Sequence, residues 1–323
     1  MIFVNTPYNR IYEVFALEYW LATEKDLGDD VFLLWSTVPT MVCGKYQNPY
    51  EEINMDYVRK NNVLISRRLS GGGTMYVDQG GMQFTFITRD SDKEISFEKF
   101  VYPVVDALKK LGVEDVTFTG RNDILVCGKK VSGNSQYKVK GCTVHHGTLL
   151  YNTDLEQVVR STTPDEQKII SKSIKSVRER VTNISEHMNR VMTIDEFKEA
   201  LINEITAGGK RYELTEEERG IIEKMSAEKF ATKEFIFGNT PKFEIEKKGY
   251  FKGGKVTIGL TVNKGKISAT EISGDFFGTI SKEEFSKLLT GVTYEREAVK
   301  SALQKLQGNI YNVSEEELLE LLF

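Results

Sequence analysis

The stretch Arg67-Arg68-Leu69-Ser70-Gly71-Gly72-Gly73-Thr74 lies between two apolar segments of strand length, residues 63–66 and 75–77. Three consecutive glycines do not suit a strand interior, because glycine has no side chain to pack and loses the most backbone entropy. They suit a tight loop whose N–H groups point at an anion, and the two arginines add fixed positive charge. A P-loop is excluded, because no Gly-Lys-Ser/Thr follows. The stretch predicts either a pocket for an anionic ligand or a glycine-rich connection with solvated arginines.

Composition and charge exclude several classes of protein. The 323 residues are 40% hydrophobic and 28% charged, which is typical of a globular chain with one large and one small domain. The net charge of −4 gives no general attraction to nucleic acid. Three cysteines without CxxC spacing indicate a reducing setting. With no signal-peptide pattern and no apolar run near the roughly 20 residues of a membrane span, we expect a cytoplasmic protein with neither nucleic-acid nor membrane partners.

Hydrophobic periodicity predicts helices and strands intermixed along the first 240 residues. Expected helices cover residues 10–25, 51–61, 96–111 (with Ser96 as the cap), 193–207 and 215–225. Expected strands cover residues 31–35, 40–43, 63–66, 75–77 and 82–87, with further short strands over 116–151 and turns at Gly120, Gly128, Gly133 and Gly141. Capping boxes are expected at Thr193/Glu196, Thr215/Glu218, Ser281/Glu284 and Ser314/Glu317. This mixture predicts an α+β fold with a mixed or antiparallel sheet, not a Rossmann fold.

The pattern changes after Thr240-Pro241. Residues 243–272 alternate as strands do, with Lys-Gly turns, and two helices follow. We therefore predict a small ββαα module, and a division of the chain into residues 1–243 and 244–323.

Four further blocks follow the glycine stretch. They are Gly120-Arg121-Asn122-Asp123-Ile124, Gly128-Lys129-Lys130-Val131-Ser132-Gly133-Asn134-Ser135-Gln136, His145-His146-Gly147-Thr148-Leu149-Leu150 and Ser176-Val177-Arg178-Glu179-Arg180-Val181-Thr182-Asn183. In order and spacing, the blocks resemble the lipoate–protein ligases over most of residues 1–240. Residues 244–323 resemble the C-terminal accessory domain of the long-form enzymes.

The resemblance implies a fold and an activity. The fold is the biotin/lipoate ligase-like (class II synthetase-like) α+β arrangement, a mixed or antiparallel sheet flanked by helices, plus a small α+β C-terminal domain. The activity is ATP-dependent activation of lipoate to lipoyl-AMP, with Mg²⁺. The lipoyl group then passes to a lysine of an acceptor lipoyl domain, in a 2-oxoacid dehydrogenase subunit or the glycine cleavage H protein.

Lys130 is the predicted catalytic residue. Activation of a carboxylate by ATP builds negative charge on phosphorus oxygens, and fixed positive charge stabilises it. Lys130 stands between Gly128 and the expected Ser132-Gly133 turn, where its ammonium reaches a pocket as a point charge; the alternative is an exposed turn lysine. The resemblance implies that it contacts the acyl carboxyl group and the phosphate. Lys129 is expected to point away, because strand side chains alternate.

Asp123 is the predicted metal ligand, because Mg²⁺ near a triphosphate uses one or two carboxylates. An Asx turn is the alternative interpretation. Asn122 either binds the nucleotide or closes the same turn. The resemblance implies that Arg68 faces the ligand, and that His146 rather than its neighbour lines the lipoate site; His146 as a support for its loop is the alternative. The predicted ligand-binding residues are Arg68, Ser70, Gly71, Gly72, Gly73, Tyr76, Asn122, Asp123, Ser132, Gly133 and His146.

The chain departs from the family pattern in one place. The usual Tyr-His-Asp-x-Gly-Asn is here Tyr76-Val77-Asp78-Gln79-Gly80-Gly81, so that Val77 replaces a histidine and Gly81 an amide. Both changes bear on acyl specificity and catalytic efficiency. Two other functions stay open. One is an ATP-independent lipoyl or octanoyl transferase with Cys142 as its nucleophile. The other is a non-enzymatic lipoate or lipoyl-protein binder.

Overall fold

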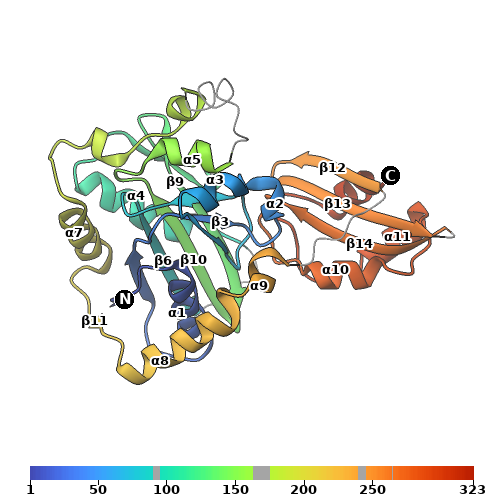
Figure 1. Cartoon of the computed structure of the whole chain (residues 1–323), viewed down its shortest axis with the longest axis horizontal. Helices are drawn as coiled ribbons and strands as arrows, with labels where there is room; N and C mark the ends of the chain where they lie inside the picture. The colour runs from blue at the N-terminus through green and yellow to red at the C-terminus, as the bar shows by residue number, and fades with distance from the viewer. Residues whose placement is uncertain (90–94, 163–174, 239–244, 264) are drawn as a thin grey trace.

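The computed structural model describes residues 1–89, 95–162, 175–238, 245–263 and 265–323. Figure 1 shows an elongated molecule with a large N-terminal body and a smaller C-terminal region that carries its own sheet. The predicted boundary between residues 243 and 244 lies outside the described residues.

An eight-stranded mixed sheet forms the centre of the N-terminal body. Its order is β11 (Arg211–Tyr212), β1 (Ile2–Val4), β2 (Val31–Trp35), β6 (Met82–Arg89), β10 (Cys142–Leu149), β9 (Lys129–Val139), β8 (Asp123–Val126) and β7 (Val116–Phe118). Strand β1 is parallel to both of its neighbours, and the other pairs are antiparallel. The predicted α+β class with a mixed sheet is therefore confirmed.

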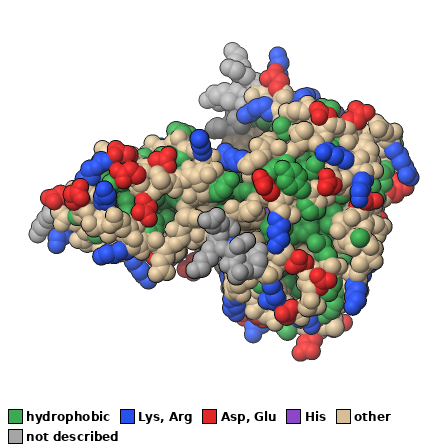
Figure 2. Space-filling model, turned by 180° about the vertical axis from the view of Figure 1, so that it is seen from behind, with side chains coloured by type: hydrophobic (Ala, Val, Ile, Leu, Met, Phe, Trp, Pro, Cys, Tyr) green, Lys and Arg blue, Asp and Glu red, His purple; other side chains and the backbone are tan. Residues whose placement is uncertain are grey.

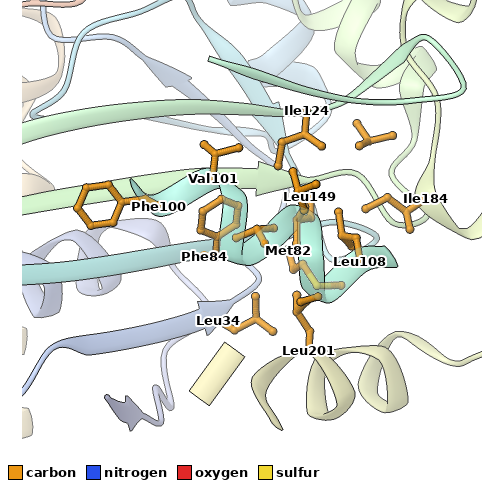
Figure 3. Packing of buried hydrophobic residues seen from close by; sticks show 14 of the residues in the cluster. Leu34, Met82, Phe84, Phe100, Val101, Leu108, Ile124, Leu149, Ile184 and Leu201 are labelled. Carbon is orange, nitrogen blue, oxygen red and sulfur yellow. The ribbon is translucent and has the colours of Figure 1, made fainter. Parts of the chain in front are cut away.

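Helices cover both faces of this sheet. Helices α4 (Glu98–Lys110) and α7 (Ile194–Thr206) pack on one face, where Leu34, Phe84 and Leu149 lie in the core (Figure 3). Helix α1 (Ile11–Thr23) packs on the other face, and α8 (Glu216–Met225) packs against α1. Strand β2 alternates between these two cores, which explains why it is apolar throughout.

A second, three-stranded sheet carries the segments on either side of the glycine stretch. Its order is β4 (Leu64–Arg67), β3 (Thr40–Cys43) and β5 (Met75–Val77), flanked by α2 (Pro49–Glu52), α3 (Met55–Lys60) and α5 (Leu155–Thr162). The single helix predicted over 51–61 is two helices, because the Asn54 side chain accepts from the Tyr57 N–H and begins α3 anew. Cys43 is fully buried, as expected for a small apolar residue.

The C-terminal region has three strands and three helices. The antiparallel strands are β12 (Ile245–Phe251), β13 (Gly254–Asn263) and β14 (Lys266–Gly274), and the helices are α10 (Lys282–Leu289), α11 (Arg296–Leu303) and α12 (Glu315–Leu322). The ββαα prediction was one strand and one helix short. Asn263 pairs with Lys266, so the predicted turn between them leads into a third strand.

Long-range contacts overturn two local predictions. Ser96 does not cap α4: its backbone N–H and C=O bond instead to the Gln136 side chain, and the residue before the helix is Phe97. Gly133 is not in a turn but inside β9, paired with Asp123. Capping boxes are confirmed at Thr193/Glu196, Thr215/Glu218 and Ser314/Glu317, while Ser281 caps α10 by accepting from the Glu284 N–H.

The remaining short helices are η1 (Ile184–His187), η2 (Ser226–Phe230) and α9 (Lys233–Phe237). Within the residues that the structure describes, no helix has the length and apolarity needed to cross a membrane. The face seen in Figure 2 mixes basic and acidic side chains, without a broad patch of either sign.

A buried carboxylate links α8 to the edge of the sheet. Glu218 accepts hydrogen bonds from Lys25 Nζ and Tyr212 Oη, each at 2.7 Å, and from the Thr215 N–H at 3.0 Å. Burial by itself raises the pKa of Glu218, but these donors outweigh it and lower the pKa to about 2.

We expect Glu218 to contribute to the acid stability of the fold. Because its folded pKa of about 2 lies below its usual value of 4.5, its contribution is complete above pH 4.5 and is lost as the pH falls toward 2. Thermal unfolding between pH 7 and pH 2 should therefore show a smaller acid-induced drop for Glu218→Gln than for the wild type. The exposed neighbour provides the control, since Glu217→Gln should follow the wild-type curve; identical curves for all three proteins would contradict the assignment.

Candidate active site

Arg67 fixes the start of the glycine stretch. Its side chain is buried, and its Nη1 donates to the carbonyl oxygens of Gly44, Lys45 and Gln47 at 2.8–3.0 Å. Its Nε donates to the Ile236 carbonyl at 2.8 Å. One guanidinium thus ties the glycine stretch to the turn after β3 and to α9.

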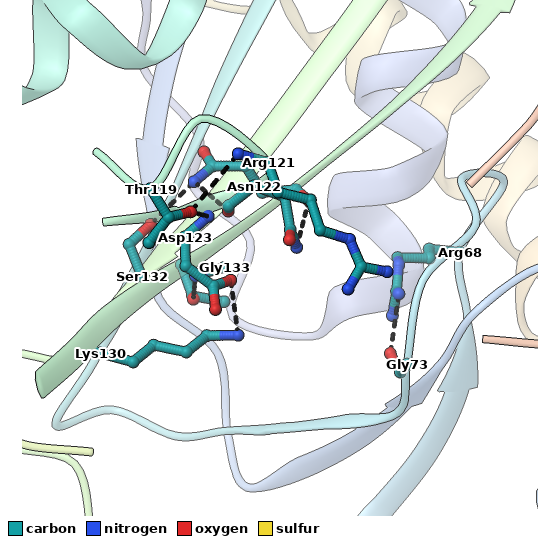
Figure 4. A network of polar contacts seen from close by, with 11 residues as sticks. Arg68, Gly73, Thr119, Arg121, Asn122, Asp123, Lys130, Ser132 and Gly133 are labelled. Carbon is teal, nitrogen blue, oxygen red and sulfur yellow. Dashed lines mark hydrogen bonds and ion pairs between the residues drawn. The ribbon is translucent and has the colours of Figure 1, made fainter. Parts of the chain in front are cut away.

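Arg68 shapes the loop itself. Its guanidinium donates to the carbonyl oxygens of Gly71 at 2.7 Å, Gly73 at 2.8 Å and Val42 at 3.2 Å (Figure 4). Burial lowers the pKa of Arg68 to about 10, so the group stays charged at neutral pH. The sequence predicts that Arg68 faces a ligand; in this structure, three of its N–H···O contacts go to the loop backbone and a fourth goes to Val42 in β3.

The C-terminal region sits directly on the glycine loop. The Gly72 N–H donates to the Phe276 carbonyl at 2.8 Å. A Cβ atom at Gly71 would lie 2.2 Å from that same oxygen, and one at Gly72 would lie 2.6 Å from the Phe277 ring, so neither position accepts a side chain. Gly72 also has a φ of +89°, which favours glycine. Gly71 and Gly72 therefore serve a close approach between the two parts of the chain, whereas a Cβ atom at Gly73 would lie 4.0 Å from its nearest neighbour, Asp275.

Lys130 and Asp123 form an ion pair at the end of β8. Lys130 Nζ lies 2.8 Å from Asp123 Oδ1, and both side chains are partly exposed. A Cβ atom at Gly133 would lie 3.1 Å from Lys130 Nζ, so the ammonium group crosses directly over this glycine. Lys129 points elsewhere and donates to the Arg178 carbonyl at 3.1 Å. The sequence thus predicted correctly that the two lysines diverge.

Asn122 and Ser132 brace the strands beneath this pair. The Asn122 side chain donates to the Asn134 carbonyl at 3.4 Å, and Asn134 donates back to the Asn122 carbonyl and to Ser132 Oγ. In Figure 4 Asn122 and Ser132 lie near Asp123 and Lys130. This contact joins the residue before β8 to β9, and the two roles predicted for Asn122, nucleotide binding and closure of the local turn, stay predictions.

A buried hydrogen-bond network connects His146 to the glycine loop. His146 Nε2 lies 2.6 Å from Ser70 Oγ, and its Nδ1 lies 3.3 Å from Glu18 Oε2. Glu18 Oε1 accepts from Thr85 Oγ1 at 2.5 Å, and Thr85 accepts from Trp35 Nε1 at 3.1 Å. All five residues are at most 6% exposed. The network runs from α1 across the sheet to the loop.

His145 faces the opposite side of the sheet, as expected for adjacent strand residues. It stacks on Phe100 with ring centroids 4.8 Å apart and bonds to Gln136 and Asn134. Burial lowers its pKa well below the usual 6.5, so the ring is neutral. His145 therefore belongs to the α4 core, and His146 is the inward residue.

A small cavity is lined both by His146 of this network and by Gly133, the glycine beneath Lys130. It has a volume of about 20 Å³, enough for one water molecule. Its lining residues come from α1 and from strands of both sheets: Phe15, Trp35, Met75, Gln83, Gly133, Ser135, His146, Gly147 and Thr148. Gly133 lies at one end beneath Lys130, and the aromatic side chains lie at the other.

Tyr76 lies apart from this cavity. In β5 its side chain points into the cluster of Met41 and Val58, whereas the neighbouring Met75 lines the cavity. Val77, one of the two departures from the family pattern, is buried in the same apolar cluster as Trp35. At Gly81, the other departure, a Cβ atom would lie 2.6 Å from Thr153 Oγ1, so packing favours glycine there.

Cys142 is placed poorly for nucleophilic catalysis. It is 1% exposed, at the start of β10, and its sulfur lies 3.4 Å from Arg89 Nη1. His146 is four residues further along the strand, about 13 Å away at 3.3 Å per residue. The nitrogens of His145, His146 and His187 lie within hydrogen-bonding distance of Gln136, Asn134, Ser70, Glu18 and Thr182, so the cation beside this thiol is the Arg89 guanidinium.

Sequence reasoning missed Glu18, Trp35 and Arg121. Glu18 carries a signal, because it falls on the apolar face of a predicted helix, three residues after Phe15. Arg121 was part of a quoted motif, and its guanidinium carbon lies 6.0 Å from the centre of the Phe277 ring. The contribution of the C-terminal region to the loop gave no local signal.

Solved structures with this fold are lipoate ligases. The structure of P. falciparum LipL1 in complex with lipoate matches with a TM-score of 0.79 at 24% identity, over 99% of this chain and 97% of that one. The bipartite lipoate protein ligase structure from Thermoplasma acidophilum matches with a TM-score of 0.66 at 26% identity, over 76% and 98%. The fold is therefore the one found in these lipoate ligases.

Sequence comparisons establish the family. The lipoyl protein ligase A/B catalytic domain matches residues 10–206, and the bacterial lipoate protein ligase C-terminus matches residues 240–322. Lipoate-protein ligase LplJ of Bacillus subtilis is 38% identical over 316 residues, and lipoate–protein ligase 1 of Staphylococcus aureus is 38% identical over 312 residues; each match covers 95% of both chains. The chain belongs to the lipoate-protein ligase family and is a ligase enzyme.

The Glu18 network should be needed for stability. In Glu18→Ala, the Thr85 hydroxyl and His146 Nδ1 lose their buried acceptor, so we expect the free energy of unfolding to fall by about 1–3 kcal/mol in urea titrations. Glu13→Ala, on the same helix but only partly buried, should cost less than about 0.5 kcal/mol. Equal losses in the two variants would show that the network adds no stability.

Proposed function

We propose that the chain is an ATP-dependent lipoate–protein ligase. It activates lipoate to lipoyl-AMP and passes the lipoyl group to a lysine of an acceptor lipoyl domain. The observation that carries the proposal is the Lys130–Asp123 pair at 2.8 Å, lying over Gly133 at one end of a cavity that is aromatic at the other. A fatty acid whose carboxylate is bound at Lys130 would place its acyl chain in that cavity.

The first step joins two anions. The lipoate carboxylate oxygen attacks the α-phosphorus of ATP, the bond to the β-phosphate oxygen breaks, and pyrophosphate leaves. Lys130 would hold the carboxylate and the developing charge on the phosphorus oxygens, which requires an ammonium placed before the reaction begins. The buried positive charges of Arg67 and Arg68 add attraction for the phosphates behind the loop.

The second step forms the amide. The ε-amino group of the acceptor lysine attacks the carbonyl carbon of lipoyl-AMP, and AMP leaves with the former carboxylate oxygen. Lys130 remains beside that oxygen and stabilises the negative charge that develops there. We infer that acceptors are 2-oxoacid dehydrogenase subunits or the glycine cleavage H protein, and that the enzyme works in the cytoplasm. In the Thermoplasma acidophilum study, the ligase is paired with its E2 lipoyl domain.

Asp123 fits a supporting role for Mg²⁺. Among the described residues, no three His, Cys, Asp or Glu side chains converge, so a metal held by protein groups alone is not built here. One partly exposed carboxylate suits Mg²⁺ that takes its other ligands from phosphates and water. When bound, Mg²⁺ would neutralise phosphate charge.

Exchange of labelled pyrophosphate into ATP, dependent on lipoate and without acceptor protein, tests the first step. We expect exchange with the wild type and a loss of about 10²–10³-fold in Lys130→Ala, because a preorganised charge is removed.

The neighbouring lysine supplies a matched control. Lys129→Ala removes the same charge from a side chain that points to Arg178, and we expect exchange within about threefold of the wild type. Folded wild-type protein that catalyses no exchange with ample lipoate, ATP and Mg²⁺ would overturn the proposed function.

We also propose that residues 1–243 and 244–323 act as two domains that separate at the glycine loop during the reaction. The Gly72 N–H already donates to Phe276, and Tyr46 Oη donates to the Ile280 carbonyl at 2.7 Å. A loop N–H held in this way is unavailable to a phosphate, so binding of the adenylate favours release of the C-terminal region.

Small-angle X-ray scattering measures this separation. We expect a non-hydrolysable lipoyl-adenylate analogue to change the radius of gyration of the wild type, and Phe277→Ala to show part of that change without ligand, because it removes the ring packed on Gly72. Tyr250→Ala removes an exposed aromatic ring from the same region and should behave as the wild type. An unchanged wild-type curve on ligand addition would exclude the motion.

A further inference from the structure

One polar side chain in the cavity has no hydrogen-bond partner for its acceptor atom. Gln83 is 3% exposed in β6 and lines the cavity together with Phe15 and His146. Its Oε1 atom accepts no hydrogen bond from any described residue. A buried unpaired amide oxygen lowers stability, and such groups are rare in folded proteins.

The other buried glutamine of this sheet shows the contrast. Gln136 lies on the opposite face, in β9, where its Oε1 accepts from the Ser96 N–H at 3.1 Å and its Nε2 donates to the Ser96 carbonyl. The sheet can therefore satisfy a buried amide completely. The unpaired oxygen of Gln83 instead points to a partner that arrives with a ligand.

The register of the strands gives the position of Gln83 along the cavity. Thr148 in β10 and Trp35 in β2 are its direct neighbours across the sheet. Thr148 Oγ1 accepts from the Gly133 N–H at 3.1 Å, so the row from Gly133 to Trp35 crosses four adjacent strands. Gln83 is two strands from Gly133, about 10 Å at the usual strand spacing. A chain whose carboxylate is held at Lys130 reaches Gln83 with its distal carbons.

We propose that Gln83 is a specificity-determining residue that hydrogen-bonds the sulfur atoms of the acyl chain, and thereby favours lipoate over an unsubstituted eight-carbon acid. This inference rests on the proposed function. It would explain how the enzyme distinguishes lipoate from octanoate, an acid with a carbon chain of the same length.

The amide suits both oxidation states of the sulfur atoms. A dithiol offers S–H donors to Oε1, and the cyclic disulfide offers sulfur lone pairs to the Nε2 hydrogens once the amide rotates by half a turn. An unsubstituted alkyl chain offers neither, so it leaves the amide buried and unpaired. Sites that pair a polar group with the substrate reject analogues that lack the matching atom.

The test compares kcat/KM for lipoate and octanoate in the pyrophosphate-exchange assay. We expect the wild type to prefer lipoate, and Gln83→Leu and Gln83→Met to reduce the lipoate-to-octanoate ratio about tenfold. Two variants of different shape separate loss of the amide from a packing defect. Gln136→Leu removes the equivalent amide from the opposite face and should keep the wild-type ratio.

Thermal unfolding supplies a second readout, independent of catalysis. Gln83→Leu should unfold at or above the wild-type temperature, because it removes an unpaired buried group. Gln136→Leu should unfold at a lower temperature, because the Ser96 N–H and C=O lose their hydrogen-bond partners. A wild type that exchanges with both acids, and whose ratio is unchanged in both Gln83 variants, would overturn the inference alone. A wild type that exchanges with neither acid would remove the proposed function and, with it, this inference.

Discussion

The site depends on two buried guanidinium groups that are satisfied by backbone carbonyl oxygens. Carbonyl dipoles accept the hydrogen bonds of Arg67 and Arg68 but do not cancel their charge, and among the described residues neither guanidinium pairs with a carboxylate. Two positive charges therefore remain beneath the glycine loop in a region of low dielectric. The same bonds fix the path of the backbone, so the geometry of the loop and its attraction for anions have one origin.

The C-terminal region uses the same loop. Each part of the chain inserts an aromatic ring into the core of the other: Tyr46 lies in the C-terminal cluster, where it stacks on Phe276 at 4.3 Å, and Phe277 lies in the cluster beneath α4. Since the Phe276 carbonyl and a phosphate oxygen would compete for the Gly72 N–H, docking of the C-terminal region and anion binding at that amide are mutually exclusive. On the proposal that the two parts separate, the glycines that permit this close docking would also offer their N–H groups to the ligand.

The sequence predicts local structure well where the interactions that decide it are made between residues close together in the chain. The apolar period of α1 and the alternation of β6 decide their class, and Thr193 and Thr215 mark helix starts through bonds made within four residues. Prediction fails where the partner is distant in the chain. Ser96 has the sequence pattern of a helix cap, but its backbone groups hydrogen-bond to the Gln136 side chain. Gly133 has the sequence pattern of a turn residue, but it lies inside β9 beneath Lys130. Within the candidate site, the divergence of Lys129 and Lys130 follows from strand geometry, whereas the carbonyl partners of Arg68 follow only from the folded loop.

The hydrogen-bond network makes the acyl cavity and the anion loop a single unit. Trp35 forms the aromatic end of the cavity and donates to Thr85, which donates to Glu18; the same carboxylate faces His146, whose other nitrogen faces Ser70 in the loop. If the proposed acyl chain displaced Trp35, it would strain contacts that end at the glycine stretch, and the proposed release of the loop by the C-terminal region would loosen the cavity in return. Because the cavity of about 20 Å³ is far below the about 300–1,000 Å³ of typical ligand sites, the acyl binding proposed above would require such an opening. On the functional proposal, acyl binding and the docking of the C-terminal region would be coupled through the contact of Ser70 with His146.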